Sequence, residues 1–439
     1  AEQHARLHAL RADAADLAYL PKANRWGYFP SVSAGWTISN ESFFPKNTFV
    51  NLLKFRGSWG QNGSLGSLGS YKYSSSMNYV TYGYPFELSG IGTTPYYQRS
   101  AYPANIVNDQ LSWETSEQID IALDARFFKG KLTTTIDWYN KKTKDLIITG
   151  VSLPAATGNS APPINAGNVS NKGLEVELGW QDKIGEFSYG VRANFATLKN
   201  EVTYMDPTVT RLAGSTWATF GTITAFEKGH PVWYFYGYKY AGVDQTSGDP
   251  LFYNKSGDVV SADNLDEVND KVQIGKGLPE LTYGITLNCA WKGIDFSIFG
   301  SGASGNDIYS CLGYSVYHNT LSKYYNERWI EGADNSNAKR PRAGCNDLDK
   351  YSTSTAFVYN GAFFKIKQIQ LGYSLPAAFT RRLEIENLRI YASLDDWFTF
   401  TSYPGLDPEA ASNSYSGMGL DFGSYPNARK TMFGISLTF

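Results

Sequence analysis

The sequence has little cysteine, little histidine and no long hydrophobic run. Its 439 residues include 3 Cys and 4 His, and no apolar stretch has the roughly 18 residues that a membrane-spanning helix needs. Three cysteines are too few for a disulfide framework, and the four histidines lack the spacing of metal ligands. A transmembrane helix is therefore excluded, whereas membrane strands, whose only signal is alternation, are not.

The chain also lacks an excess of charge of either sign. It has 39 Lys and Arg against 41 Asp and Glu, a formal net charge of -2, and hence no basic field for nucleic acid. Aromatic residues, in contrast, are abundant, with 31 Tyr, 25 Phe and 11 Trp making 15% of the chain. Such rings accumulate in the girdles where a β-barrel meets lipid headgroups.

Alternation of apolar and polar residues recurs along the chain. Residues 431–439 alternate in this way and end on Phe439, which resembles the insertion signal of bacterial outer-membrane barrels. For that segment alone, a soluble β-sandwich is an equal alternative. In 173–180, however, four apolar residues lie opposite Glu175 and Glu177, and comparable patterns occupy other segments. A sandwich core would not admit charges on strand after strand, so we expect a water-filled barrel with an apolar outer face.

Strands are predicted between alternating short and long connections. Eleven are expected, at 26–38, 50–60, 112–127, 130–148, 171–182, 187–203, 280–291, 294–302, 362–375, 387–402 and 428–439. A twelfth is predicted near 5–12, although 1–20 is otherwise an uncertain lead-in or strand. Long loops are expected at 61–111, 149–170, 204–279, 303–361 and 403–425, because outer-membrane barrels have short periplasmic turns and long outer loops.

Several ordered motifs carry a family resemblance. They are NRWGYFPSVSAGW at 24–36, LKFRGSWGQNG at 53–63, WYNKKTKDL at 138–146, NAGNVSNKGLE at 165–175, FFKIKQIQLGYSLP at 363–376, GLDPE at 405–409 and GSYP at 423–426. In these motifs the chain resembles the SusC-like TonB-dependent transporters of Bacteroidota. The resemblance identifies 21–439 with the C-terminal part of their barrel.

The resemblance implies an all-β fold, a transmembrane antiparallel β-barrel of 22 strands, of which this chain supplies the last 11 or 12. The family's plug domain and TonB-contacting segment have no counterpart in these residues. Two open sheet edges could not stand in lipid, so we expect the N-terminal half of the barrel to come from another chain, a cleaved fragment or a part outside this sequence.

Function follows from the same resemblance. It implies TonB-dependent import of a nutrient across the outer membrane, an oligosaccharide or glycan first and a peptide second, together with a SusD-like surface lipoprotein that closes over the barrel. The expected partners are this lipoprotein, the TonB complex, the other half of the barrel and membrane lipid, with no nucleic acid. A passive porin or an adhesin scaffold is the alternative from another class. No residues suggest catalysis, and no enzyme is predicted.

Aromatic residues in the long loops are the candidate substrate-binding groups, because rings stack on sugar faces and pack on peptides. The residues singled out are Trp217, Trp233, Tyr234, Tyr236, Tyr317 and Trp329. The alternative is that these rings pack on one another or on a partner protein.

Two further sets of loop residues have candidate roles. Asp244, Asp249 and Asp258 offer the oxygen ligands that Ca²⁺ prefers, although the EF-hand order is absent and a polar turn explains them equally simply. No other cofactor is expected. Cys311 and Cys345 fall in one loop, where an oxidising setting would allow them to form a disulfide, and Cys289 is predicted to be a small lipid-facing hydrophobe.

Overall fold

A computed structural model describes the chain apart from scattered segments. The residues outside the description are 1–5, 17–18, 46–48, 67, 70–71, 76, 80–84, 87–95, 98–100, 104–105, 150, 152, 160, 314–321, 346, 381–383 and 412–415. Everything below concerns the remaining residues.

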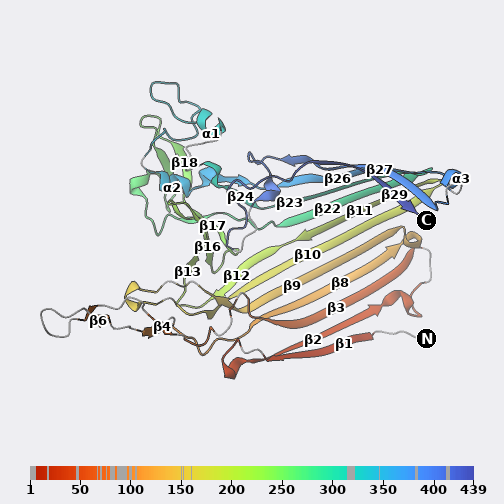
Figure 1. Cartoon of the computed structure of the whole chain (residues 1–439), viewed down its shortest axis with the longest axis horizontal. Coiled ribbons are helices and arrows are strands. Elements are labelled where there is room, and N and C mark those ends of the chain that lie inside the picture. The colour runs from red at the N-terminus through yellow and green to blue at the C-terminus, as the bar shows by residue number, and fades with distance from the viewer. Residues whose placement is uncertain are drawn as a thin grey trace.

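One long antiparallel sheet dominates the molecule (Figure 1). Its strands, in spatial as well as sequence order, are β1 (Arg6–Asp16), β2 (Trp26–Thr37), β3 (Val50–Ser64), β8 (Glu114–Phe127), β9 (Leu132–Ile148), β10 (Ile164–Ile184), β11 (Phe187–Thr197), β22 (Leu281–Trp291), β23 (Ile294–Ser304), β26 (Phe363–Ser374), β27 (Asn387–Thr401) and β29 (Lys430–Thr438). Each strand pairs with the next strand in this order, so β1 and β29 are the two edges of the sheet. The predicted strands and the twelfth strand near the N-terminus are confirmed.

The connections differ at the two ends of the sheet, as predicted. At one end they span 38–49, 128–131, 185–186, 292–293 and 375–386, and at the other 17–25, 65–113, 149–163, 206–280, 305–362 and 402–429. Two boundaries were predicted wrongly. β10 begins at Ile164 because its first residues pair with both β9 and β12 (Lys199–Met205), and the strand expected at 187–203 divides near Leu198 because β22 does not continue beside it.

Register shows which residues share a face. Directly opposed residues of antiparallel strands point to the same side of the sheet. One row across the sheet is large and apolar, and it reads Trp36, Phe55, Leu123, Ile136, Val176, Phe195 and Tyr283. The neighbouring row on the other side is polar or small, and it reads Thr37, Lys54, Asp124, Thr135, Glu177, Asn194 and Gly284. We call these the outer and the lumenal face of the wall.

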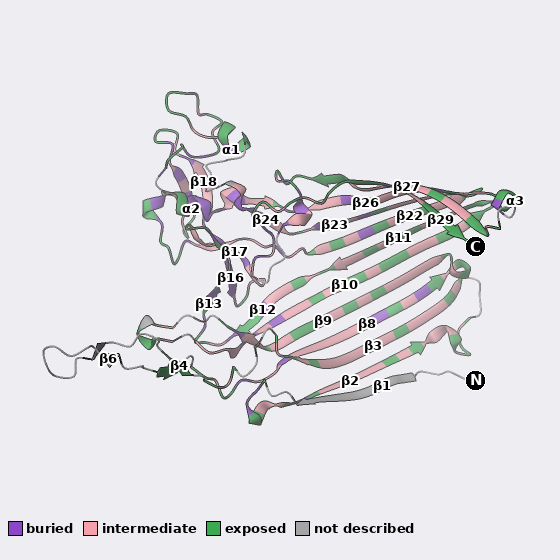
Figure 2. Cartoon of the chain, viewed as in Figure 1, coloured by how far each residue is buried: buried purple, intermediate pink, exposed green. Residues whose placement is uncertain are grey.

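Much of the apolar face is exposed in the isolated chain. Exposed fractions are 45% for Phe55, 44% for Ile121 and 83% for Phe433, whereas most of the buried residues lie in the connections at one end of the sheet (Figure 2). Large apolar side chains left open on one face of a sheet are typical of a surface that lipid covers. The predicted apolar outer face is therefore present.

Three of the long connections fold together into what we call the loop body, the described residues of 206–280, 305–362 and 402–429. It contains four small sheets and two short α-helices, seen at the upper left in Figure 1. Its strands are β13 (Arg211–Ala213), β14 (Thr216–Trp217), β15 (Gly221–Thr222), β16 (Thr224–Glu227), β17 (Tyr234–Gly237), β18 (Lys239–Val243), β19 (Pro250–Tyr253), β20 (Val259–Ser261), β21 (Val272–Gly275), β24 (Asp307–Ser310), β25 (Val358–Asn360) and β28 (Leu420–Asp421).

The remaining elements are short. The helices α1 (Ser322–Asn326) and α2 (Leu348–Ser352) belong to the loop body, and α3 (Ala377–Thr380) follows β26. The 65–113 connection carries β4 (Met77–Tyr79) paired with β7 (Ala101–Pro103), and β5 (Pro85–Phe86) paired with β6 (Tyr96–Tyr97). Among the described residues no helix is long and apolar enough to cross a membrane.

Candidate functional site

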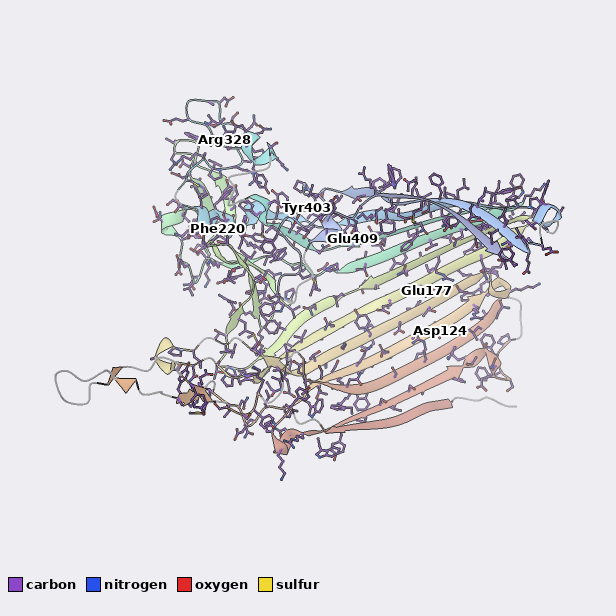
Figure 3. All side chains as sticks on the ribbon, in the orientation of Figure 1. Asp124, Glu177, Phe220, Arg328, Tyr403 and Glu409 are labelled. Atoms are coloured by element: carbon purple, nitrogen blue, oxygen red, sulfur yellow. The ribbon has the colours of Figure 1, made fainter. Side chains whose placement is uncertain are left out.

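The candidate site has two parts, the lumenal face of the wall and the loop body next to it (Figure 3). On the lumenal face, Arg56 of β3 bridges two carboxylates, with Nε 3.2 Å from Asp124 Oδ2 and Nη2 2.8 Å from Asp137 Oδ2. Thr135 donates a hydrogen bond to Asp124 at 3.2 Å. These groups come from three adjacent strands, so charge pairing across the strands fixes a polar wall.

A second ion pair lies on the same face near the end with short connections. Arg389 Nε of β27 lies 2.9 Å from Asp295 Oδ1 of β23, and Arg389 also donates to Gln370 of the strand between them at 3.0 Å. The wall is thus hydrophilic at two separate places around the sheet. A solute passing along this face would meet charged and amide groups.

A buried ionic cluster fastens the 402–429 connection to the lumenal face. Lys365 of β26 is only 2% exposed, and its Nζ lies 2.8 Å from Asp407 Oδ2 and 3.1 Å from Glu409 Oε2. Lys367 also pairs with Glu409. Lys365 is directly opposite Ser301, which pairs with Gly284 of the lumenal row, so the connection is held on the lumen side.

The Asp407 and Glu409 carboxyl groups of this cluster are held ionised. Burial by itself raises the pKa of Asp407, but hydrogen bonds from Lys365 and from the backbone N–H groups of Glu409 and Asn427 outweigh burial, and the pKa is lowered. The pKa of Glu409 is likewise lowered, since Lys367 and Lys365 outweigh its burial. Both anions are therefore stabilised by the cations of the wall, and we call this cluster the latch.

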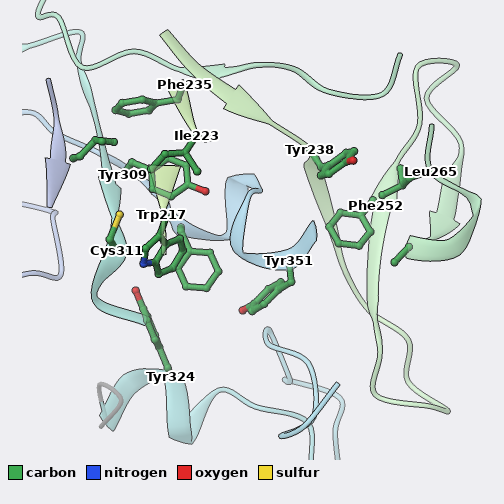
Figure 4. Packing of buried hydrophobic residues seen from close by; sticks show 13 residues of the cluster. Trp217, Ile223, Phe235, Tyr238, Phe252, Leu265, Tyr309, Cys311, Tyr324 and Tyr351 are labelled. Atoms are coloured by element: carbon green, nitrogen blue, oxygen red, sulfur yellow. The ribbon is translucent and has the colours of Figure 1, made fainter. Parts of the chain in front are cut away.

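The loop body has an aromatic core of its own (Figure 4). Trp217 is 3% exposed and meets the rings of Phe220, Tyr309 and Phe357 edge-on at centroid distances of 5.5, 6.0 and 5.0 Å. All three connections contribute, because Leu420 from the last of them is fully buried in the same cluster. The loop body is therefore a folded unit and not a set of separate loops.

A buried cation stiffens this core. The guanidinium carbon of Arg340 lies 3.5 Å from the ring centroid of Tyr324, and Arg340 donates hydrogen bonds to Tyr351 Oη at 2.9 Å and Tyr359 Oη at 2.8 Å. Burial raises the pKa of Tyr351 to about 12, although the charge of Arg340 opposes the rise. The phenols of Tyr351 and Tyr359 stay neutral near neutral pH and act as hydrogen-bonding groups, not as bases.

Three of the six predicted binding residues are buried within the loop body. The exposed fractions are 3% for Trp217, 1% for Tyr234 and 8% for Tyr236. Tyr234 donates to Glu227 at 2.8 Å and stacks on His230, and Tyr236 is covered by the Arg211 guanidinium at 4.3 Å. Protein groups therefore cover the faces of these rings in the described chain, which favours the alternative that they pack on protein, and their role as ligand platforms stays a prediction.

The other three differ in position. Trp233 packs partly buried against Phe226, with ring centroids 5.3 Å apart. Trp329 is half-buried, and its Nε1 donates to the Gln245 carbonyl at 3.1 Å. Tyr317 lies outside the described residues. The structure therefore does not bring the five described residues together at one surface.

The three predicted calcium ligands serve turns and an ion pair. Asp244 accepts the N–H groups of Thr246 at 2.7 Å and Ser247 at 2.9 Å, which lowers its pKa. Asp249 pairs with Arg342 at 3.0 Å, and Asp258 accepts from Asn254 Nδ2 at 3.3 Å. Within the described residues no group of three His, Cys, Asp or Glu side chains is placed to hold a metal ion. Loop calcium remains a prediction without support from these contacts.

The disulfide that the sequence allows between Cys311 and Cys345 is not formed. Cys289, Cys311 and Cys345 are all free thiols, and the latter two are buried. Cys311 packs in the aromatic core beside Trp217 and Tyr309, whereas the charges that act on the Cys345 thiol are those of Arg342, Asp249 and Asp347. The two thiols thus occupy different surroundings, and burial raises the pKa of each. Cys289 lies opposite Phe296 on the outer face, as predicted.

Sequence reasoning missed a set of exposed apolar side chains beside the latch. Leu406 is 68% exposed, Phe422 53% and Tyr425 88%, and all belong to the connection that Lys365 holds on the lumen side. The motifs GLDPE and GSYP mark this segment in the sequence. The sequence does not show the ion pairs of the latch, which hold this segment at the lumenal face.

Comparisons with known proteins agree with this geometry. The model of the family described as "TonB dependent receptor-like, beta-barrel" matches residues 6–271. The chain belongs to this family. Membership, together with the apolar outer face, places it in the bacterial outer membrane.

Individual relatives are distant but match nearly the whole chain. TonB-dependent receptor P3 of Formosa agariphila is 29% identical over 95% of this chain and 42% of its own length, and TonB-dependent receptor SusC of Bacteroides thetaiotaomicron is 29% identical over 95% and 40%. The structure of the RagAB peptide transporter superposes with a TM-score of 0.80 at 23% identity, over 97% of this chain and 44% of that one. The chain thus spans about two fifths of the length of these relatives, and the RagAB likeness shows the fold.

Proposed function

We propose that this chain supplies the C-terminal wall and the outer loops of a TonB-dependent importer of the SusC and RagA type. The observation that carries the proposal is the two-faced wall, apolar outside and charged inside, in a chain of the TonB-dependent receptor family. A charged inner wall suits passage of a hydrated solute. Family membership favours energy-coupled import over the passive porin or adhesin alternative, and it is a family of receptors, not of enzymes.

The cargo would be an oligomeric nutrient, either an oligosaccharide or a peptide. The exposed side chains of Leu406, Phe422 and Tyr425 offer apolar and ring surface on the connection that Lys365 holds at the lumenal face. Such surface stacks on sugars and packs on peptide side chains equally well. The RagAB structures are described as a peptide transporter, which supports a peptide, whereas the oligosaccharide rests on the resemblance of the sequence motifs to SusC-like transporters.

The partners in this proposal are a SusD-like lipoprotein over the loop body, the N-terminal half of the barrel at the two sheet edges, and TonB acting through a plug outside these residues. Open edges such as β1 and β29 require pairing within lipid, which supports a second half. The lipoprotein rests on likeness to the SusC and RagA type.

The test is titration calorimetry of the intact purified protein with panels of oligosaccharides and peptides, joined to uptake by cells with and without TonB. We expect binding of one class without turnover and TonB-dependent uptake. Replacing both Phe422 and Tyr425 by alanine should weaken binding about 5-fold or more, since each ring contributes about 0.5–1.5 kcal/mol. Tyr253→Ala, at an exposed ring far from the latch in sequence, is the control. Uptake unaffected by loss of TonB, or conversion of the ligand, would refute the proposal.

A further inference from the structure

The outer face of the wall carries a depression of about 850 Å³ where β12 and β22 separate. Its apolar lining consists of Trp138, Leu174, Leu198, Leu278, Pro279 and Leu281. Trp138 is directly opposite Leu174, and they are 40% and 41% exposed. Since Leu174 is two residues from Val176 of the outer row, both belong to the lipid-facing surface.

Two lysines border this depression on the same face. Lys172 of β10 is directly opposite Lys199 of β12, and both side chains are exposed. Neither makes an ion pair within the described part of the chain. Like charges directly opposite each other destabilise a strand pair, so an anion between them would relieve that cost.

The other charges at the depression nearly cancel. Lys276 pairs with Glu280 four residues later. Glu201 lies two residues beyond Lys199 on the same face, which leaves a net charge of about one positive unit at the mouth. The positive charge is therefore concentrated at the lysine pair.

Position along the wall relates this pair to the membrane. Lys172 lies opposite Asn140, eight positions after Leu132, where β9 starts at the end with short connections. Eight residues of a strand tilted as in outer-membrane barrels rise about 20 Å, against an apolar band about 25 Å tall. The ammonium groups thus reach the outer headgroup level while Trp138 and Leu174 stay among acyl chains.

We propose that this depression binds a phosphate-bearing lipid of the outer leaflet, with its phosphate between Lys172 and Lys199 and an acyl chain along Trp138 and Leu174. A soluble anion would satisfy the lysines alone. A lipid accounts for both the lysine pair and the apolar lining of the depression, because an amphipathic ligand carries an anionic headgroup and an acyl chain in one molecule. This site is on the opposite face from the transport path and does not depend on the substrate.

Native mass spectrometry of the intact protein in detergent tests the proposal with three probes, namely a short-chain phosphatidic acid, a phosphatidylcholine of the same chain length, and inorganic phosphate. We expect phosphatidic acid to bind most tightly. The double variant Lys172→Gln/Lys199→Gln should bind it about 30-fold more weakly, since each lysine at an anionic lipid contributes a factor of about five. Leu174→Ser should weaken the binding of phosphatidic acid and leave any binding of inorganic phosphate unchanged.

The matched control is Lys129→Gln/Lys183→Gln, which removes the same charge at exposed residues of the short-connection end. It should retain wild-type affinity. Undiminished phosphatidic acid binding in the Lys172/Lys199 variant, equal binding of phosphatidylcholine, or inorganic phosphate binding as tightly as the lipid would each overturn the proposal. If the double variant fails to assemble, the single variants Lys172→Gln and Lys199→Gln carry the same test with about a 5-fold expected loss each.

Discussion

The wall and the loop body use aromatic and aliphatic residues in opposite ways. In the wall, Phe433 and Ile435 are 83% and 69% exposed, whereas in the loop body Phe235 and Tyr309 are completely buried. Lipid covers the wall, so its strands need no second layer of protein. The loop body stands in water and must build its own core. Aromatic and aliphatic residues thus face lipid in the wall and pack against other protein groups in the loop body.

The two regions also treat charge differently. Ion pairs of the lumenal wall are partly open, with the Arg56 side chain 37% exposed, and such pairs contribute little to stability. The Lys365 side chain is 2% exposed and meets Asp407, which is 5% exposed. Removing one partner of a buried pair leaves an unpaired charge. A single substitution in the latch should therefore detach the 402–429 connection from the wall.

The largest expected effect is in the aromatic core. Trp217→Ala should destabilise the loop body by about 4 kcal/mol, because it empties the space between Phe220, Tyr309 and Phe357. The wall should still assemble. Hydrogen exchange of the loop body, together with heat-modifiable gel mobility of the barrel, measures the two effects separately.

Trp138→Ala on the lipid-facing surface is the matched control for that substitution. It should leave exchange in the loop body at the wild-type level. Equal protection in the Trp217 and Trp138 variants would show that the loop body has no independent core.

The next effect is at the latch. Lys365→Met should cost the 402–429 segment about 3 kcal/mol, since Asp407 and Glu409 lose their shared cation and Glu409 is already partly solvated. We expect rapid proteolysis within this segment while the Trp217 cluster stays protected. Lys131→Met, which breaks an exposed pair with Asp182, is the control and should not change cleavage. Wild-type resistance in the Lys365 variant would contradict the latch.

Acidification should weaken the latch in a predictable direction. The pKa values of Asp407 and Glu409 are lowered in the folded protein, so their contribution is complete above the ordinary carboxyl pKa range near 4 and is lost as pH falls below it. Proteolysis of 402–429 by an acid-active protease should therefore accelerate below about pH 4. The Lys365→Met variant should show a weaker acceleration, because Lys367 and backbone N–H groups then still hold the two carboxylates, and an identical pH profile in both proteins would contradict the role of Lys365.

The wall could be predicted from the sequence and the loop body could not, for a physical reason. Alternation is a local signal, so the segment with Glu175 and Glu177 already showed a two-faced strand. The core of the loop body brings Trp217, Tyr309 and Leu420 together from three separate connections, and no local pattern reports such contacts. Rings that pack on protein and rings that await a ligand have the same sequence signature, which is why Tyr234 and Tyr236 were interpreted as binding residues.

The smallest perturbation tests the orientation of the wall itself. Single cysteines at Val176 and Glu177, in a background with Cys289, Cys311 and Cys345 replaced by alanine, should differ in labelling by a membrane-impermeant maleimide. Residue 177 faces water in the lumen and should react readily, whereas residue 176 lies between Ile136 and Phe195 against lipid and should react slowly. Neither change should alter assembly measurably. Faster labelling at 176 than at 177 would show that the face assigned to lipid lines the lumen. It would then also contradict the lipid site proposed at Lys172 and Lys199.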